Sequence, residues 1–252
     1  MDEAALAILK GMGGPMNADD IPKLARLFIY GDPGVGKTDL TARIIQAYGG
    51  KPIWLYTDSG ISTVTKFPEL AKETWFAPFD GFNQVRLIAQ ARDEGIEPFC
   101  NYDTLVLDTV STAGINVLRE LVETNPMPGE QKHRNIEAWG HYRLLENSLK
   151  DTIKVLNRSG MHTIYLAHIR DPTEKDKEKK RFAIRPAGSE GAYRVVAQEV
   201  NAIGWLYKDR DGRKIQFSAT LQETAKTQIP TVDEKTYPVN QVPELISKYI
   251  NS

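Results

Sequence analysis

The sequence predicts an α/β fold with a mostly parallel sheet and helices on both of its faces. Three observations lead to this prediction. Residues 28–48 join an apolar stretch to a helical stretch through a glycine-rich loop, and apolar runs alternate with helical runs along the rest of the chain. Residues 201–221 have the pattern of a C-terminal β-hairpin. Alternating strands and helices are typical of parallel sheets, because parallel neighbours need a crossover connection.

The glycine-rich loop, GDPGVGKT at residues 31–38, fits the pattern G-x-x-x-x-G-K-[ST]. Glycines allow a tight turn whose N–H groups converge on phosphate oxygens, and the following helix adds the partial positive charge of its N-terminus. We expect Lys37 to reach the β- and γ-phosphates and the Thr38 hydroxyl to bind Mg²⁺, with ATP as the nucleotide. The alternative is an ordinary glycine-rich turn. The expected nucleotide-binding residues are Gly31, Asp32, Pro33, Gly34, Val35, Gly36, Lys37, Thr38 and Asp39.

The composition is that of a folded protein, with 41% hydrophobic and 26% charged residues in a chain of 252. We expect one domain over residues 1–252, with an N-terminal extension at 1–24 and a C-terminal tail at 222–252. The sequence contains no run of 18 apolar residues, so no membrane span is predicted. The first 14 residues lack the basic region of a secretion signal, and the single cysteine, Cys100, excludes an internal disulfide framework. These features favour the cytoplasm.

The remaining elements follow from periodicity and turn residues. Strands are expected at 51–58, 75–79, 102–111 and 162–170, followed by the hairpin at 201–221, which should turn at Asp211-Gly212. Helices are expected at 82–94, 110–123, 136–158, 190–199 and 241–250.

Two aspartates are candidates for catalysis. Asp108 ends the strand pattern TLVLD, where an acid can support Mg²⁺ through water; alternatively it caps the next helix. Thr109 follows it in place of a glutamate, so the group that orients the attacking water comes from elsewhere or hydrolysis is slow. Asp58 is the candidate, since the ends of parallel strands converge on one crevice. The alternative for Asp58 is a turn aspartate in TDSG.

His168 lies near the end of the strand at 162–170. A polar side chain there can contact the γ-phosphate and pass the nucleotide state into the loop that follows. The alternative is a histidine that merely ends a strand.

Together these residues resemble the RecA-like ATPase core of recombinases, KaiC-type proteins and DnaB-type helicases. More narrowly, the chain resembles the phage-encoded RecA-like ATPases of the Sak-four type, which are associated with single-strand annealing and recombination. The resemblance covers most of residues 27–208. Four stretches carry it: GDPGVGKT, YDTLVLDTVS, WGHYRLLENSLKDTIKVLNRSGMHTIYLAHIR and IRPAGSEGAYRVVAQEVNAIGWLYK.

The resemblance implies roles for the residues within one subunit. Lys37 and Thr38 would bind phosphate and Mg²⁺, and Asp108 would support the metal. Asp58 stands where these proteins usually have a catalytic glutamate, so its carboxylate is set back by one methylene. His168 stands where they have a polar γ-phosphate sensor.

The resemblance also implies a contact between subunits of a homo-oligomer, either a ring or a filament. The segment TAKTQ, residues 224–228, resembles the basic finger that these proteins offer to a neighbour's nucleotide. Lys226 would be its cation. Gln228 replaces an expected arginine, which implies a weaker or differently placed contact.

Two loops of such a core face the axis of the oligomer and would bind single-stranded DNA. Residues 170–185 carry seven Lys/Arg against four Asp/Glu, although the net charge of the chain is −1. Phe182 and Tyr193 could stack on bases. Alternatively, TEKDKEKK is a solvated loop of alternating charge. The expected DNA-binding residues are Lys132, Arg134, Lys177, Lys179, Lys180, Arg181 and Arg185.

The sequence thus predicts an oligomeric ATPase, stimulated by single-stranded DNA, that acts in phage recombination or annealing in the host cytoplasm. A single-strand-binding protein or a nuclease is a candidate partner. Three alternatives stay open: an accessory or helicase-loader ATPase of replication, a scaffold that hydrolyses little ATP, and a small-molecule kinase. A kinase usually has an arginine-rich lid, whereas the segment in that position here is lysine-rich and acidic.

Overall fold

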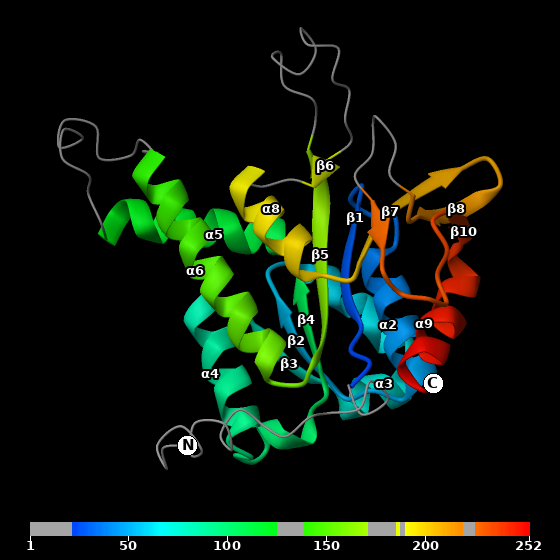
Figure 1. The fold of residues 1–252 in the computed structure, drawn as a ribbon, viewed down its shortest axis with the longest axis horizontal. Coiled ribbons are helices and arrows are strands. Elements are labelled where there is room, and N and C mark those ends of the chain that lie inside the picture. The colour runs from blue at the N-terminus through cyan, green and yellow to red at the C-terminus, as the bar shows by residue number, and fades with distance from the viewer. Residues whose placement is uncertain (1–21, 125–138, 171–184, 187–189, 219–224) are drawn as a thin grey trace, which may run out of the picture.

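The computed structural model describes residues 22–124, 139–170, 185–186, 190–218 and 225–252. In these residues a central sheet has the strand order β10-β8-β7-β1-β5-β4-β2-β3, with β6 added to β5 and β9 to β7 (Figure 1). Its strands are β1 (Arg26–Gly31), β2 (Pro52–Tyr56), β3 (Trp75–Pro78), β4 (Thr104–Asp108), β5 (His162–Arg170), β6 (Arg185–Pro186), β7 (Ala202–Asp209), β8 (Gly212–Gln216), β9 (Lys226–Thr227) and β10 (Thr236–Pro238).

Helices connect most of the strands. The α-helices of the described residues are α2 (Lys37–Tyr48), α3 (Pro68–Glu73), α4 (Phe82–Asp93), α5 (Val110–Thr124), α6 (Trp139–Arg158), α8 (Glu190–Glu199) and α9 (Val242–Ile250). The same part of the chain contains the short 3₁₀ helices η2 (Ser59–Lys66), η3 (Phe99–Asn101) and η4 (Val239–Gln241). None of the helices in the described ranges is long and apolar enough to cross a membrane.

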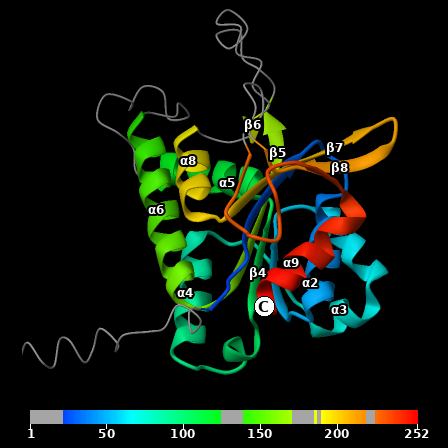
Figure 2. The ribbon, with the colours of Figure 1, turned by 45° about the vertical axis from the view of Figure 1, so that its right-hand side comes forward.

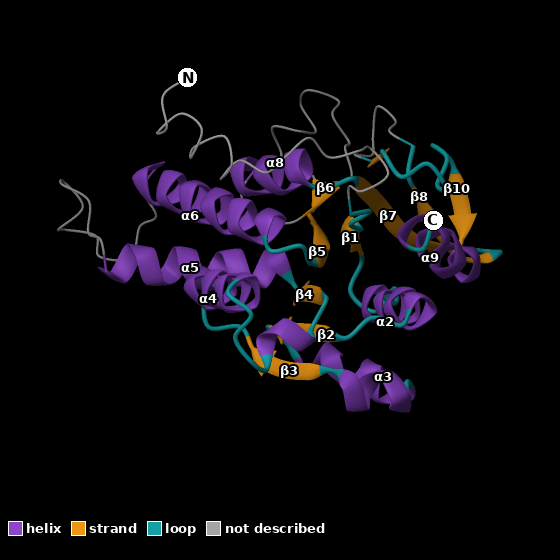
Figure 3. Cartoon of the chain, turned by 60° about the horizontal axis from the view of Figure 1, so that its bottom comes forward, coloured by secondary structure: helices purple, strands orange, loops and turns teal. Residues whose placement is uncertain are grey.

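The sheet confirms the predicted architecture. Strands β7, β1, β5, β4, β2 and β3 are parallel, while β8 and β10 extend the sheet in antiparallel fashion. Helices α2 and α9 cover one face, and α4, α5, α6 and α8 cover the other (Figure 3). The β7–β8 hairpin extends beyond the body of the sheet (Figure 2). The α/β fold with helices on both faces and a C-terminal hairpin is therefore present.

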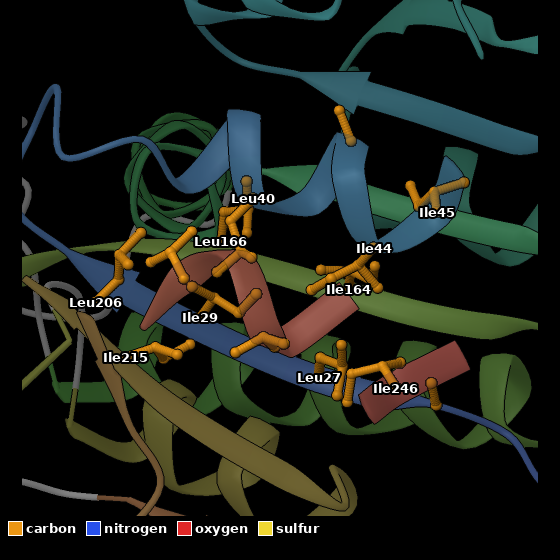
Figure 4. Packing of buried hydrophobic residues seen from close by; sticks show 14 of the residues in the cluster. Leu27, Ile29, Leu40, Ile44, Ile45, Ile164, Leu166, Leu206, Ile215 and Ile246 are labelled. Atoms are coloured by element: carbon orange, nitrogen blue, oxygen red, sulfur yellow. The ribbon is translucent and has the colours of Figure 1, made fainter. Parts of the chain in front are cut away.

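The central strand β1 is buried on both faces, which explains its continuous apolar run. Leu27 and Ile29 point into one core, where they meet Leu40 and Ile44 of α2 and Ile246 of α9 (Figure 4). The residues between them, Phe28 and Tyr30, belong to the core on the opposite face. Each fully buried side chain of this size stabilises the fold by ~1.5–3 kcal/mol relative to exposure. This packing holds the C-terminal end of β1 rigidly in the centre of the sheet.

The strand at 51–58 is shorter than predicted, because β2 ends at Tyr56. Asp58 is instead the N-cap of the 3₁₀ helix η2, and its Oδ1 accepts a hydrogen bond from Gly60 N at 2.8 Å. An aspartate is a favoured cap, since its carboxylate satisfies a free N–H at the start of a helix. Short elements such as η2 lack a sequence period long enough to reveal them.

The hairpin turn lies one residue earlier than predicted. Asp209 pairs with Gly212, so Arg210 and Asp211 form the two-residue turn and Gly212 begins β8. Asp209 Oδ1 accepts a hydrogen bond from Asp211 N, and Lys214 Nζ contacts carboxylates of both aspartates. These local charges hold the turn in the observed register.

The register of the parallel strands aligns their C-terminal ends at one edge. Gly31, the last residue of β1, lies opposite His168 of β5 and Leu206 of β7. Tyr56 of β2 lies opposite Asp108 of β4. The phosphate loop, both candidate aspartates and the candidate histidine are therefore brought to the same edge of the sheet, where ligands bind in such folds.

Candidate nucleotide-binding site

A cavity of about 250 Å³ lies at the C-terminal ends of β1, β2, β4 and β5. It is formed by the phosphate loop, the start of α2, the segment around η2 and the ends of β4 and β5. The residues that line it are Pro33, Gly34, Gly36, Lys37, Thr38, Asp39, Asp58, Gly60, Thr63, Asp108, Thr109 and His168.

The glycines of the phosphate loop serve two different purposes. Gly34 and Gly36 have φ values of 76° and 100°, a left-handed conformation that side chains disfavour. They form the turn that leads into α2. Gly31 is needed for a different reason, since a Cβ there would lie 2.3 Å from the carbonyl oxygen of Leu206 in β7. The first glycine therefore permits close packing of the strands, and the later ones shape the phosphate nest.

Lys37 lies at the centre of the site and is only 6% exposed. Its Nζ donates hydrogen bonds to the carbonyl oxygens of Gly31 at 3.0 Å and Asp32 at 2.9 Å. Burial lowers its pKa, although nearby Asp108, Asp32 and Asp58 act in the opposite direction. The ammonium is thus held at the mouth of the loop, where it can meet the β- and γ-phosphates.

Thr38 and Asp108 form the part of the site that suits a magnesium ion. Thr38 Oγ1 donates a hydrogen bond to Asp108 Oδ2 at 3.0 Å, and the Asp108 side chain is buried. Hydroxyl and carboxylate oxygens are hard ligands of the kind that Mg²⁺ prefers. The residues therefore fit the ion: Thr38 would be its ligand, and Asp108 would support it. When bound, Mg²⁺ would neutralise charge between the β- and γ-phosphates.

Thr57 positions this acid, a role that the sequence did not reveal. Its backbone N–H donates to the carbonyl oxygen of Asp108 at 2.7 Å, and its Oγ1 donates to the same oxygen at 3.2 Å. Thr109 N donates in turn to Thr57 Oγ1 at 3.0 Å. The ends of β2 and β4 are thereby joined. A threonine after a strand carries no signal in the sequence that would have identified this contact.

Asp108 has an unusual affinity for protons. Burial raises its pKa to about 6, and the neighbouring Asp58 carboxylate contributes in the same direction. The folded protein thus keeps this proton up to about pH 6, whereas the unfolded chain releases it near pH 3.8. Ionisation of Asp108 therefore lowers the stability of the fold as the pH rises from about 3.8 to about 6. Above pH 6 the carboxylate form, which a cation needs, prevails.

We expect magnesium-dependent ATP binding to weaken below pH 6, by up to about tenfold per pH unit, because Asp108 must be ionised to support the cation. Titration calorimetry from pH 5 to 8 measures this loss. Asp108→Asn is the control, since the terminal phosphate titrates near pH 6 for both proteins. The ratio of the two affinities should fall toward acid pH, and a constant ratio would contradict the assignment.

Asp58 lies against the same group of charges. It lines the cavity, and its charge acts on Lys37, Asp108 and His168. Its Oδ1 caps η2 through Gly60 N. A carboxylate has a second oxygen, so capping through Oδ1 leaves Oδ2 able to accept a hydrogen bond from water.

His168 is fixed by β5 and by the helix that follows β4. Its backbone N–H donates to Ser111 Oγ at 3.1 Å, and its Nδ1 lies 3.5 Å from Lys37 Nζ. Burial and the Lys37 ammonium lower the pKa of His168, so the ring is neutral at neutral pH. A neutral ring can accept from Lys37 through Nδ1, and it joins the central lysine to the end of β5.

Arg213 of β8 reaches the phosphate loop from the hairpin, which the sequence did not reveal. Its Nη1 donates to Asp39 Oδ2 at 3.1 Å, and Arg43 Nε donates to the same oxygen at 3.1 Å. A Cβ on Gly36 would lie 2.2 Å from Arg213 Nη1. Burial alone would raise the pKa of Asp39, but the two arginines hold it below its ordinary value. The charged turn DRDGRK gave no sign that one of its arginines touches the loop.

The structure therefore brings together Lys37, Thr38, Asp58, Asp108 and His168, the residues expected within one subunit. Lys226 is not among them. It lies in β9 opposite Ile203 of β7, and burial lowers its pKa despite the opposing effect of Glu199. It is not among the residues that line the cavity.

The expected DNA-binding residues lie mostly outside the described residues. This holds for Lys132, Arg134, Lys177, Lys179, Lys180 and Arg181, and for the aromatic Phe182. Arg185 is described at the level of its backbone, which pairs with Arg170 in the β5–β6 ladder.

The chain is similar in fold to solved structures of low sequence identity. No curated protein matches it. Among solved structures, the KaiC-like protein PH0186 from the archaeon Pyrococcus horikoshii OT3 matches with 14% identity and a TM-score of 0.49, over 86% of this chain and 85% of that chain. The RadB recombinase matches with 16% identity and a TM-score of 0.45, over 77% and 80%.

The phosphate loop between β1 and α2, in a mostly parallel sheet with helices on both faces, gives the α/β P-loop fold that the sequence predicts. The model of a family described as the AAA domain matches residues 23–229. The match covers most of the chain and includes the whole cavity, so this protein belongs to the AAA domain family.

Proposed function

We propose that this protein is a magnesium-dependent ATPase that binds single-stranded DNA as a homo-oligomer and acts in recombination or annealing. One observation carries the proposal. A buried lysine, a Thr–Asp pair suited to Mg²⁺, a second carboxylate and a neutral histidine share one cavity at the phosphate loop. Nucleotide binding alone needs only the first two, whereas the other groups supply what hydrolysis requires.

In this proposal each group acts on a different part of the reaction. Asp58 Oδ2 orients the attacking water and accepts its proton, as a carboxylate near the γ-phosphate can. Lys37 stabilises the charge that develops on the phosphoryl oxygens. His168 contacts the γ-phosphate through Nδ1, the ring nitrogen that lies beside Lys37 Nζ. The position of the His168 ring therefore depends on whether that phosphate is present.

The path from His168 toward the basic segment supports a role in DNA binding. Strand β5 continues two residues past His168 to Arg170, which pairs with Arg185 of β6. Arg170 and Arg185 are the ends of the basic segment 170–185, so this segment joins the two strands directly. A shift of His168 on loss of the γ-phosphate can thus reach the segment through one continuous strand, in the manner of other nucleotide switches. Lys226 would act on the nucleotide of a neighbouring subunit.

The proposal for DNA is tested by measuring ATP hydrolysis with Mg²⁺, with and without a single-stranded oligonucleotide at low salt. We expect the DNA to raise the rate several-fold, and the binding to weaken as salt increases, because phosphate contacts release counterions. Replacing Lys177, Lys179, Lys180 and Arg181 together with glutamine should abolish the stimulation.

The matched control replaces Lys72 of α3 and Lys248 of α9 with glutamine. Each is an exposed lysine paired with a glutamate of its own helix, and the double variant should keep the stimulation. If the wild-type protein hydrolysed ATP at one rate regardless of DNA, and bound no oligonucleotide at low salt, the role in DNA metabolism would be abandoned and the ATPase retained.

A further inference from the structure

The phosphate loop has a second cation from the same chain, at the end of the site away from the γ-phosphate groups. Arg213 crosses from the β7–β8 hairpin to α2, and its guanidinium contacts Asp39 and lies beside Gly36. Its side chain is 39% exposed, whereas that of Asp39 is 12% exposed. In the described residues its one hydrogen bond is to Asp39, so most of its five N–H donors are available to a ligand.

The two ends of the cavity differ in chemistry. Asp58, Asp108 and His168 gather around the Lys37 ammonium, which reaches the β- and γ-phosphates. Asp39 lies two residues beyond Lys37, in the first turn of α2, where backbone N–H groups of such loops hold the α- and β-phosphates. Arg213 is not among the residues that line the cavity, but it contacts Asp39 and lies beside Gly36, which do line it. It therefore borders the α-phosphate and nucleoside end of the site.

We propose that Arg213 is a binding residue for the nucleotide, contacting the α-phosphate and ribose end that ATP and ADP share. The inference rests on the proposed function as an ATP site. Arginine suits this place, because its planar guanidinium can hold a phosphate through two donors while it stays paired with a carboxylate. Asp39 holds the guanidinium ready when no nucleotide is bound.

A purely structural role for the ion pair makes a different prediction. If Arg213 only anchored the hairpin to α2 through Asp39, then loss of either partner would have the same effect on nucleotide binding. If Arg213 touches the nucleotide, Asp39→Asn keeps the guanidinium and removes a negative charge near the phosphates. Arg213→Met must then be the more damaging of the two substitutions.

The test is titration calorimetry of ATP and ADP, each with Mg²⁺, on the full chain and four variants. These are Arg213→Met, Arg213→Lys, Asp39→Asn and Lys214→Met. Lys214 is the matched control, since it is the neighbouring cation on β8 and its contacts are with Asp209 and Asp211 of the hairpin. Thermal unfolding without nucleotide shows whether each variant is folded.

We expect Arg213→Met to weaken ATP and ADP by the same factor, about tenfold, as for the loss of one charged hydrogen bond. Arg213→Lys should recover part of this loss, Lys214→Met should bind as the wild type does, and Asp39→Asn should lose less than about threefold.

Two results would overturn the inference: wild-type affinity in Arg213→Met, or equal losses in Arg213→Met and Asp39→Asn. Failure of the proposed function would give a different result, because the wild-type protein itself would then bind neither ATP nor ADP.

Discussion

Lys37→Ala should reduce ATP hydrolysis by about 100- to 1,000-fold, which is the effect of removing one preorganised donor from a developing charge. The ammonium is buried and its position is fixed by the carbonyl oxygens of Gly31 and Asp32. Among the residues that the structure describes, no other lysine lines the cavity, so none of them can replace it. Steady-state hydrolysis with Mg²⁺ measures the loss, and nucleotide binding should weaken with it.

Lys51→Ala is the matched control for this substitution. Lys51 is an exposed lysine paired with Glu73, and its loss should leave hydrolysis unchanged. Circular dichroism and thermal unfolding establish that both variants are folded. Hydrolysis by Lys37→Ala at the wild-type rate would mean that the measured activity does not arise at this loop.

Asp58→Asn should lower hydrolysis by about 100- to 10,000-fold while ATP binding is retained, because general bases contribute factors of this size. The amide is close in shape to the carboxylate, and its oxygen can still accept from Gly60 N, so η2 keeps its cap. Single-turnover hydrolysis measures the chemical step, and calorimetry measures binding. Loss of the first without the second is the expected signature of a water-orienting group.

Two further variants sharpen the result for Asp58. Asp58→Glu restores the carboxylate one methylene further out and should retain measurable hydrolysis, unlike Asp58→Asn. Asp93→Asn, an exposed aspartate at the end of α4, is the control that should behave as the wild-type protein does. If Asp58→Asn hydrolysed ATP normally, the attacking water would be oriented by another residue and the assignment to Asp58 would fall.

The sequence by itself determined the features that depend on neighbouring residues. The apolar run of β1, the loop GDPGVGKT and the helix α2 form one contiguous segment, so their pattern revealed both the strand–loop–helix order and the site for phosphate. Strand β5 was predicted to the residue because a buried apolar run at 164–167 lies at its centre, as expected for a strand covered on both faces. Asp108 could be identified because it ends such a run.

Only the tertiary structure decided which of these groups meet. The pairs Lys37–His168 and Thr38–Asp108 are separated by 131 and 70 residues, and sheet register brings them into contact. Thr57, and Arg213 at 174 residues from Asp39, could not be predicted, because a polar residue outside an apolar run has the same local sequence pattern whether or not it touches a site. Local sequence specifies the elements through burial and turn chemistry, whereas contacts between distant side chains depend on how the sheet aligns its strands.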